Sequence, residues 1–483
     1  MTRASMPNEY PPGSLVDSPA TLATEALLED LRDAGVAFDT ATAARADHGR
    51  DWWPLTIPDV ARGRVPRWPG VVVRATSSED VSRVLTIAST HHVAVTAQGG
   101  RSSVVGGAVA PEGAIALDLT GLDRVLDIDV KSGTVSVEAG VFGPDLERAV
   151  ANEGFTVGHF PQSFELATVG GWIACRGAGQ YSNRYGKIED IVRALTVVLA
   201  NGDVIELGGR APRQAVGPDL MQLFIGSEGT LGVITRATLV LHPTPASEQR
   251  AAYAFTDFDT GLDACRLIMQ RDARPAVLRL YDETESKRSF GVESCVLIVL
   301  DEGDPLLVGA TMKIVAEECV AAKECDGSLV ATWLEHRNDV GALAPLWERG
   351  YVVDTIEVAG MWSTLPSMRR AVIDALGQMP AITVASVHQS HAYLDGACLY
   401  FTFAARPDED VTDFYRRAWT CVTEEVLAHG GALSHHHGVG RNRARFVPEA
   451  LGSAFGVLQD VKRLLDPDDI MNPGVLGIGG APW

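Results

Sequence analysis

Three glycine-dense stretches, at residues 99–107, 161–186 and 225–235, restrict the fold of this chain more than any other feature. Glycine loses more backbone entropy on folding than any other residue, so such stretches suit places where the chain turns tightly or lies close to a ligand. The middle stretch contains Gly170, Gly171, Gly177, Gly179 and Gly186. Apolar and aromatic residues separate these glycines, whereas a flexible linker is typically rich in serine or proline. We therefore expect backbone that packs against a bound ligand.

The first stretch reads Gly99-Gly100-Arg101-Ser102-Ser103-Val104-Val105-Gly106-Gly107. It follows an expected strand, and a turn of this composition bares several backbone N–H groups beside two hydroxyls. Such a turn suits an anion such as a pyrophosphate. The chain has no strand–Gly-x-Gly-x-x-Gly–helix unit, so the common dinucleotide fold is not indicated. Three glycine-dense stretches in order favour a phosphate-bearing cofactor more strongly than one alone.

Short apolar runs alternate with helical patterns around these stretches. Strands are predicted at residues 71–73, 93–96, 114–119, 134–138, 194–199 and 204–207, and helices at 20–34, 77–89 and 146–153. Ser77 is the expected N-cap of its helix, and Asn201-Gly202 is typical of a hairpin turn. From about residue 246 to 433 the pattern indicates a second α+β domain. Its clearest elements are strands at 296–300 and 399–403 and a helix at 412–427.

Near the C-terminus the chain reads Ser434-His435-His436-His437-Gly438-Val439-Gly440. The run is internal, so a purification tag is excluded, and a surface loop, a metal site and an acid–base site stay open. On an extended segment successive side chains alternate between faces, so we expect only His435 with His437, or His436 alone, in one cavity. Zinc takes three or four protein ligands, so the sequence predicts proton-transfer histidines and no metal site.

The net charge and the cysteine content limit the possible binding partners and the cellular compartment. The net charge of −21 argues against nucleic acid and anionic membranes as partners, and a phosphorylated substrate would need a local arginine cluster. Seven scattered cysteines predict free thiols in a reducing cytoplasm. We expect no signal peptide and no transmembrane segment, since no apolar run approaches the ~20 residues that span a bilayer. The expected partner is a small-molecule or lipid-like substrate, and a homodimer stays open.

Three motifs carry a resemblance to a known family. They are Pro161-Gln-Ser-Phe-Glu-Leu-Ala-Thr168-Val-Gly-Gly-Trp172, Tyr185-Gly186-Lys-Ile-Glu-Asp190 and Gly226-Ser-Glu-Gly-Thr-Leu-Gly-Val-Ile-Thr235. They resemble the FAD-binding domain of the vanillyl-alcohol-oxidase (PCMH-type) flavoproteins. The triple-histidine motif is similar to that of the alkyldihydroxyacetonephosphate synthase (alkylglycerone-phosphate synthase) branch, whereas the D-lactate and glycolate dehydrogenase branch has Gly-Glu-His-Gly there. Further matches to the synthase branch are Arg279-Leu-Tyr-Asp282, Gly396-Ala-Cys-Leu-Tyr-Phe401, Glu357 with Trp362, and Ile470-Met-Asn-Pro473.

The resemblance implies an α+β fold in four parts. Residues 1–65 would be a helical and irregular N-terminal segment, and residues 66–245 a PCMH-type FAD-binding domain of two α/β subdomains. Residues 246–433 would form a cap, or substrate, domain with an antiparallel sheet. Residues 434–483 would carry the histidine motif and return to the FAD domain.

The resemblance also implies how FAD is held. Gly99, Gly100, Arg101, Ser102 and Ser103 would line the pyrophosphate. The rest of the cofactor would follow Pro161, Ser163, Thr168, Gly170, Gly171, Trp172, Gly177, Gly179 and Tyr185, with Glu228 and Ile234 at its ribose and adenine end. Many relatives tether FAD through a histidine or cysteine in the first loop, and this loop has neither. FAD is therefore expected to be non-covalent.

For the activity, the resemblance implies a redox-neutral exchange. The acyl group of acyl-dihydroxyacetone phosphate is replaced by a fatty alcohol while flavin N5 holds the dihydroxyacetone-phosphate fragment. Tyr400 matches an acid/base tyrosine, Arg279 matches an active-site arginine, and the histidines at 435, 436 and 437 match groups that assist proton transfer. The alternative is an FAD-linked oxidase or dehydrogenase of a 2-hydroxy acid or another small alcohol.

Composition alone leaves other roles open for these residues. Tyr400 lies on an apolar strand, where a packed aromatic residue is the commoner outcome. Arg279 could pair with Asp282 rather than with a ligand, and His391 could be a catalytic partner or a structural histidine. The arginines that follow the histidines are expected on a solvated basic face, namely Arg441, Arg443 and Arg445.

Two departures from the family pattern lie near the expected flavin. Arg101 stands where the family has glycine, so the loop must tolerate a side chain there, and Arg101 could contact a phosphate. Cys175 replaces a threonine of the family. These changes leave the substrate more open than the cofactor.

Overall fold

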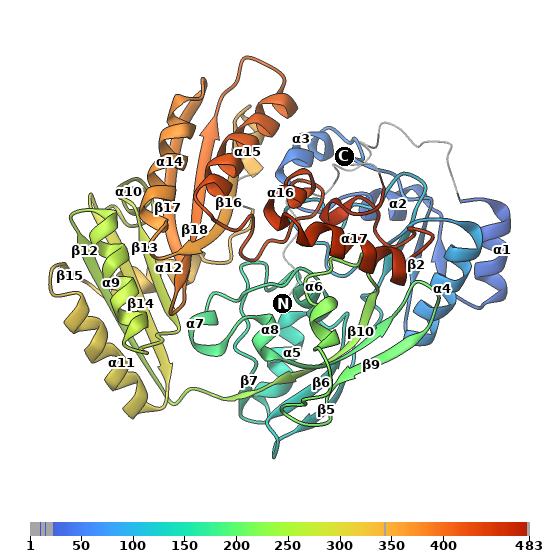
Figure 1. Cartoon of the computed structure of the whole chain (residues 1–483), viewed down its shortest axis with the longest axis horizontal. Helices are drawn as coiled ribbons and strands as arrows, with labels where there is room; N and C mark the ends of the chain where they lie inside the picture. The colour runs from blue at the N-terminus through green and yellow to red at the C-terminus, as the bar shows by residue number, and fades with distance from the viewer. Residues whose placement is uncertain (1–9, 11–14, 16–22, 342–343, 481–483) are drawn as a thin grey trace.

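The computed structural model describes residues 10, 15, 23–341 and 344–480. Their main β-sheets divide the molecule into two parts. Two smaller sheets with their helices lie on the right and at the bottom of Figure 1, and a seven-stranded sheet lies on the left. The C-terminal segment, in red, returns across the first part. The fold is α+β, as the sequence predicts.

The first sheet has the strand order β1-β2-β4-β3. Its strands are Phe38–Asp39 (β1), Val71–Arg74 (β2), Val95–Gln98 (β3) and Ile115–Asp118 (β4), and its helices are Glu25–Asp33 (α1), Thr42–His48 (α2), Ile57–Ala61 (α3) and Ser78–His91 (α4). Strands β2, β4 and β3 run parallel, which brings the glycine stretch after β3 to the carboxyl edge of the sheet. The Ser77 hydroxyl caps α4 by accepting the N–H of Asp80, as predicted.

The second sheet has the order β5-β6-β10-β8-β9, with antiparallel neighbours throughout. Its strands are Val125–Asp129 (β5), Thr134–Glu138 (β6), Val192–Val198 (β8), Val204–Gly208 (β9) and Val233–Val240 (β10). A small pair joins Phe155–Thr156 (β7) to His242–Pro243 (β11). The helices of this region are Gly143–Ala151 (α5), Val169–Ala174 (α6), Ser182–Tyr185 (α7) and Ile188–Ile191 (α8). The predicted hairpin between β8 and β9 is confirmed.

The cap sheet has the order β15-β12-β14-β13-β17-β18-β16 and is antiparallel at every pairing, as expected. Its strands are Ser247–Phe255 (β12), Val277–Tyr281 (β13), Cys295–Gly303 (β14), Lys323–Cys325 (β15), Val352–Met361 (β16), Ile382–Ala392 (β17) and Gly396–Ala405 (β18). One apolar cluster joins this sheet to Phe258–Gln270 (α9), Pro305–Glu318 (α11), Leu365–Gln378 (α14) and Val411–Ala428 (α15).

A second apolar cluster packs the cap against the part of the molecule that carries the glycine-dense stretches. It joins Ser328–His336 (α12) and strands of the sheet to Tyr181 and Tyr185 beside α7. The remaining helices are Glu283–Phe290 (α10), Ala344–Glu348 (α13), Val447–Leu451 (α16) and Ala454–Leu465 (α17), with 3-10 turns at Pro54–Thr56, Leu220–Leu223, Ala444–Phe446 and Val475–Gly477. None of the helices in the described part of the chain is long and apolar enough to cross a membrane.

The C-terminal segment is tied to the first part by buried polar contacts. Lys462 of α17 donates to the carbonyls of Thr230 and Met471 and pairs with Asp466. The Asn472 amide donates to the carbonyls of Gly107 and Glu228, at 3.1 and 2.8 Å. The segment that follows the histidine run is thereby held against two of the glycine-dense stretches.

Some element boundaries differ from the prediction. The strand expected from residue 93 begins at Val95, because His92 takes a left-handed conformation and the Val93 N–H still bonds to the helix. The helix expected from residue 20 begins at Glu25, capped by Thr24, while residues 20–22 lie outside the described part. Strand β5 was not predicted, since its polar and apolar residues do not alternate cleanly.

Candidate active site

Three antiparallel strands of the cap carry a row of polar residues. Glu357 on β16 is opposite Tyr400 on β18, and Tyr400 is opposite His388 on β17. Directly opposed residues point to the same face of a sheet, so the three side chains share one face. The His388 and Tyr400 rings stack with centroids 4.8 Å apart.

Glu357 anchors the histidine run. Its carboxylate accepts hydrogen bonds from the Ser434 hydroxyl at 2.7 Å, the His437 N–H at 3.0 Å and the His435 N–H, and it pairs with Arg443 at 3.0 Å. Burial alone would raise the pKa of Glu357, but Arg443, His437 and these donors hold the pKa well below its usual value. An ionised carboxylate on β16 therefore fixes the position of the histidine run, which follows α15 in the chain.

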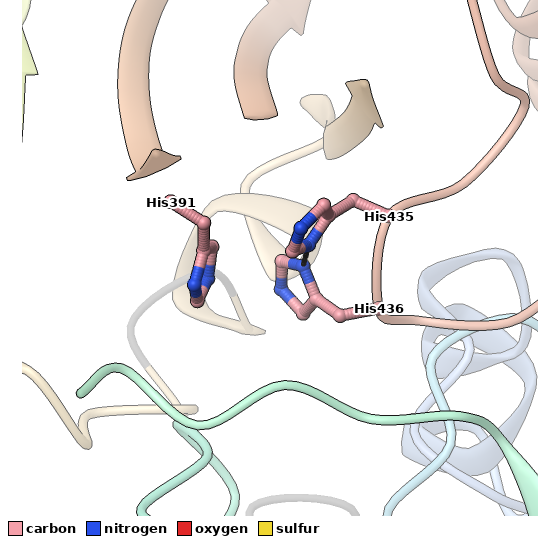
Figure 2. Close-up of side chains that lie close together, drawn as sticks. All are labelled: His391, His435 and His436. Atoms are coloured by element: carbon pink, nitrogen blue, oxygen red, sulfur yellow. Dashed lines mark hydrogen bonds between the residues drawn. The ribbon is translucent and has the colours of Figure 1, made fainter. Parts of the chain in front are cut away.

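The expectation that His435 and His436 face opposite sides is wrong. Residues 434–437 form a bend rather than a strand, because Glu357 draws the backbone N–H groups of His435 and His437 toward one point. The Nδ1 atoms of His435 and His436 lie 2.9 Å apart, and the His391 ring stacks on His435 at 4.7 Å (Figure 2). Burial lowers the pKa of His435 and of His436 to about 3, and that of His391 well below its usual value.

Tyr400 and His437 form a contact that can move a proton. The Tyr400 hydroxyl lies 3.5 Å from His437 Nε2 and accepts a hydrogen bond from Thr355 at 3.1 Å. On its other side, His437 Nδ1 is 3.5 Å from Glu357. Burial raises the pKa of Tyr400, and burial lowers that of His437 to about 4, so both are neutral at pH 7. The His437 imidazole thus lies between the Tyr400 hydroxyl and the Glu357 carboxylate.

Arg279 has no acidic partner among the described residues. Asp282, the partner considered from the sequence, instead caps α10 through the Glu285 N–H and accepts the Val387 N–H. Arg279 donates to His388 Nε2 at 2.8 Å, and its buried Nε has no hydrogen-bond partner in the described chain. His388 Nδ1 lies 2.8 Å from Glu285. A guanidinium in this position is suited to an anionic ligand.

A cavity of about 380 Å³ opens beside His435, between the cap and the part that carries the glycine-dense stretches. Its walls carry Arg176, Lys187, Glu189, Ala359, Tyr393, Asp395, Ser434 and His435. The Tyr393 hydroxyl contacts His435 Nε2. The cavity therefore leads from the domain boundary to the histidine run.

The first glycine stretch fits a pyrophosphate. Within the described chain, the successive backbone N–H groups of residues 100–104 donate to no protein acceptor. A Cβ on Gly100 would lie 1.6 Å from the Leu166 carbonyl oxygen, and one on Gly99 would lie 2.2 Å from Thr168 Oγ1. Arg101 has a left-handed φ of 54°, which turns neighbouring N–H groups into an anion-binding concavity. The residues present therefore fit the phosphate-bearing half of FAD.

Sequence and structure comparisons place this site in a family. The family model of the FAD binding domain matches residues 69–208, and that of the FAD linked oxidases, C-terminal domain, matches residues 244–476. The chain belongs to the PCMH-type FAD-linked oxidase family. Its cofactor is the FAD of that family.

Relatives include both oxidoreductases and synthases. The chain is 34% identical over 430 residues to the uncharacterized FAD-linked oxidoreductase YgcU of Escherichia coli (strain K12), covering 84% of this chain and 89% of that protein. It is 28% identical over 519 residues to alkyldihydroxyacetonephosphate synthase of Caenorhabditis elegans, covering 97% and 86%. A solved structure of an alkyldihydroxyacetonephosphate synthase is similar to it with a TM-score of 0.77 at 25% identity, covering 96% of this chain and 90% of that one.

The other residues expected to contact FAD pack closely against neighbouring backbone or lie in the core, and their contacts to FAD stay predictions. Thr168 caps α6 by accepting the Gly171 N–H, and Gly170 lies so close to Ala139 that a Cβ would meet it at 2.8 Å. The backbone also passes closely at Gly179, where a Cβ would lie 2.6 Å from Phe160 N. Pro161 and Ser163 accept backbone N–H groups in the turn before α6, and Ile234 is buried in the core of the second sheet. Gly177 donates to the Trp172 carbonyl, closing the end of α6.

Three of these residues also hold the protein together. Tyr185 donates to Glu302 of the cap at 2.6 Å. Glu228 accepts the N–H groups of Val439 and Gly440, at 2.7 and 2.8 Å, just after the histidine run. Arg101 pairs with Asp47 at 2.7 Å. Their contacts to FAD stay predictions.

The expectation of a solvated basic face after the histidines is wrong for two of the three arginines. Arg443 is 1% exposed and Arg441 8% exposed, and only Arg445 faces solvent. Arg443 is buried because it neutralises Glu357, and Arg441 because it donates to the carbonyls of Val109 and Pro473. Both hold the histidine segment in place.

Sequence reasoning missed three polar residues of this region. His388 and Glu285 bind one another behind Arg279. His159 is fully buried against Trp172, and neither of its ring nitrogens has a hydrogen-bond partner in the described chain. The run of four polar residues from His388 to His391, at the end of an otherwise mainly apolar β17, was the one signal that pointed to a polar site on this strand.

Proposed function

We propose that this protein is an FAD-dependent enzyme of the alkyldihydroxyacetonephosphate synthase type. It exchanges the acyl group of acyl-dihydroxyacetone phosphate for a fatty alcohol. It holds FAD non-covalently and acts in the cytoplasm. The observation that carries the proposal is the series of Tyr400, His437 and Glu357 beside an arginine without an acidic partner in the described chain. The relationship to the Caenorhabditis elegans synthase supports it.

The side chains would divide the work by their chemistry. The phosphate of the substrate would bind Arg279, because a guanidinium without an acidic partner and with an unpaired Nε–H matches a phosphate or carboxylate. The alcohol must lose its hydroxyl proton as it replaces the departing carboxylate. Tyr400 can take that proton as His437 Nε2 accepts the tyrosine proton, and Glu357 stabilises the charged imidazole that results. Bound FAD supplies the centre that holds the dihydroxyacetone-phosphate fragment between the two halves of the exchange.

A second candidate is an FAD-linked oxidoreductase of a 2-hydroxy acid or another small alcohol. The family and the relationship to YgcU favour it. Arg279 would then bind the carboxylate of the hydroxy acid, and Tyr400 with His437 would remove the hydroxyl proton. The two candidates share the site and differ in whether electrons leave the substrate.

The deciding experiment follows the flavin absorbance of the purified protein under anaerobic conditions. Palmitoyl-dihydroxyacetone phosphate should bleach the flavin, and hexadecanol should restore the colour with formation of the alkyl ether. Absence of bleaching by this substrate, together with bleaching by a 2-hydroxy acid, would replace the first candidate with the second.

A further inference from the structure

Three imidazoles converge beside the cavity that leads to the histidine run. One ring nitrogen from each of His391, His435 and His436 lies within 4.8 Å of the other two (Figure 2). His391 comes from the end of β17, and the other two come from the bend that Glu357 holds. In a tetrahedral zinc site with Zn–N bonds of 2.0–2.1 Å, ligand nitrogens lie about 3.4 Å apart. A small side-chain rotation would bring this set into that range.

The atoms behind two of the three rings are arranged as in metal sites. A metal-binding histidine usually holds its other ring nitrogen in a hydrogen bond that fixes the ring and its tautomer. Here His391 Nδ1 lies 2.8 Å from the Ser182 hydroxyl, and His435 Nε2 contacts the Tyr393 hydroxyl. These contacts leave Nε2 of His391 and Nδ1 of His435 for a common ligand. Nδ1 of His436 already lies 2.9 Å from Nδ1 of His435.

An ion could reach this cluster from outside. The cavity of about 380 Å³ includes His435 and Tyr393 in its wall, and two carboxylates, Glu189 and Asp395, line it together with Arg176 and Lys187. Burial favours the neutral imidazole, which is the form that binds a metal. Two adjacent Nδ1 atoms can share one proton, and a metal ion would replace that proton.

We propose that His391, His435 and His436 form a site for a divalent transition-metal ion of the Zn²⁺ type. Three protein nitrogens leave a fourth coordination position for water or a substrate oxygen, as in catalytic zinc sites. The sequence argued against a metal because successive histidines on an extended segment diverge. The bend at residues 434–437 removes that argument and brings a third histidine from another strand. The site does not require the proposed synthase activity.

The test measures Zn²⁺ uptake by the flavin-loaded protein without any substrate. The protein is stripped with a chelator, dialysed and titrated with Zn²⁺ by calorimetry, and the metal content is determined by mass spectrometry. We expect about one tightly bound ion per chain. His391→Gln and His436→Gln should abolish this binding, and Tyr393→Phe should weaken it about 10- to 100-fold, the usual cost of removing a hydrogen-bond partner of a ligand.

A matched control and a second readout keep the outcome clear. His429→Gln removes a histidine at the end of α15, outside the cluster, and should bind Zn²⁺ as the unchanged protein does. Co²⁺ should give the visible absorption of a tetrahedral site in the unchanged protein, and Tyr393→Phe tests the site without removing a ligand. Uptake well below one ion, or equal uptake by His391→Gln and His429→Gln, overturns the proposal. Flavin bleaching by either substrate class is scored separately, so failure here leaves the proposed function standing.

Discussion

Arg279 donates a hydrogen bond from Nη2 to Nε2 of His388 across 2.8 Å. Arginine is only a donor, so His388 must accept at Nε2 and carry its proton on Nδ1, which faces Glu285 at 2.8 Å. Burial lowers the pKa of His388, which agrees with a neutral ring. The Glu285 carboxylate, the neutral His388 imidazole and the Arg279 guanidinium therefore form a fixed series that ends at the group proposed to bind the substrate.

Arg279→Lys should weaken the binding of an anionic substrate. Lysine keeps the charge but loses the planar fork that bonds both His388 and an anion. A charge-assisted hydrogen bond contributes about 1.5–3 kcal/mol, so kcat/KM should fall about 10- to 150-fold, mainly through KM. Steady-state kinetics with the substrate identified by flavin bleaching would measure this, and flavin content should not change. An unchanged KM would remove Arg279 from the substrate site.

Tyr400→Phe should remove turnover while leaving FAD bound. The ring would still stack on His388, but the hydroxyl that contacts His437 would be gone. Loss of a general acid–base group costs about 10²- to 10⁴-fold in kcat. Thr355→Val is the matched control, because it removes only the hydrogen bond donated to Tyr400 and should cost far less. Equal activity in Tyr400→Phe and the unchanged protein would overturn the assignment.

The α/β alternation around the first glycine stretch was sufficient to predict β2, α4, β3 and β4, because these strands are short and apolar and the helix begins at a clear cap. It did not predict β1, α2 or α3. Ser77 and the hairpin at Asn201-Gly202 are local signals, and both are confirmed. The cap was harder to predict in detail, since its sheet joins strands far apart in sequence. The pairing of Glu357, Tyr400 and His388 depends on register across three strands. No local pattern encodes that register.

The orientation of the histidine side chains could not be predicted from local sequence either. The residues of the run were recognised, but their directions depend on Glu357, which lies 78 positions before His435. Arg443 was expected in solvent because three alternating arginines usually form an exposed face. Its partner is that same distant carboxylate, so burial followed from tertiary structure alone. Long-range ion pairs of this kind cannot be inferred from spacing.

Gly100→Ala should abolish flavin binding. The new Cβ would lie 1.6 Å from the Leu166 carbonyl oxygen, so the loop that presents residues 100–104 would have to move. The ratio of flavin to protein absorbance after purification measures the loss. Gly309→Ala on α11 is the control, because nothing lies within 4 Å of its Cβ and alanine favours a helix. Full flavin content in Gly100→Ala would show that this loop does not hold the cofactor.

Glu357→Gln should destabilise the whole protein. The amide cannot neutralise Arg443, and one of its hydrogen-bonding groups would oppose a backbone N–H of the histidine segment. Breaking a buried ion pair costs about 3–5 kcal/mol. Arg463→Gln is the comparison, because its pair with Asp460 is mostly exposed and should contribute about 1 kcal/mol or less. Similar unfolding free energies for the two variants in urea would contradict the role of Glu357.

His159→Phe should make stability less sensitive to acid. Burial lowers the pKa of His159 from 6.5 to about 3, so below pH 6.5 the unfolded chain binds a proton that the folded chain does not. The stability contributed by the neutral ring is therefore present above pH 6.5 and is lost as pH falls toward 3. Between pH 7 and pH 5 this amounts to about 2 kcal/mol. Phenylalanine retains a ring against Trp172 but does not titrate. In urea unfolding, the free energy of unfolding of this variant should therefore fall less between pH 7 and pH 5, by about that amount. Parallel pH curves for the two proteins would mean that His159 gains a hydrogen-bond partner, such as the bound cofactor, that offsets the effect of burial.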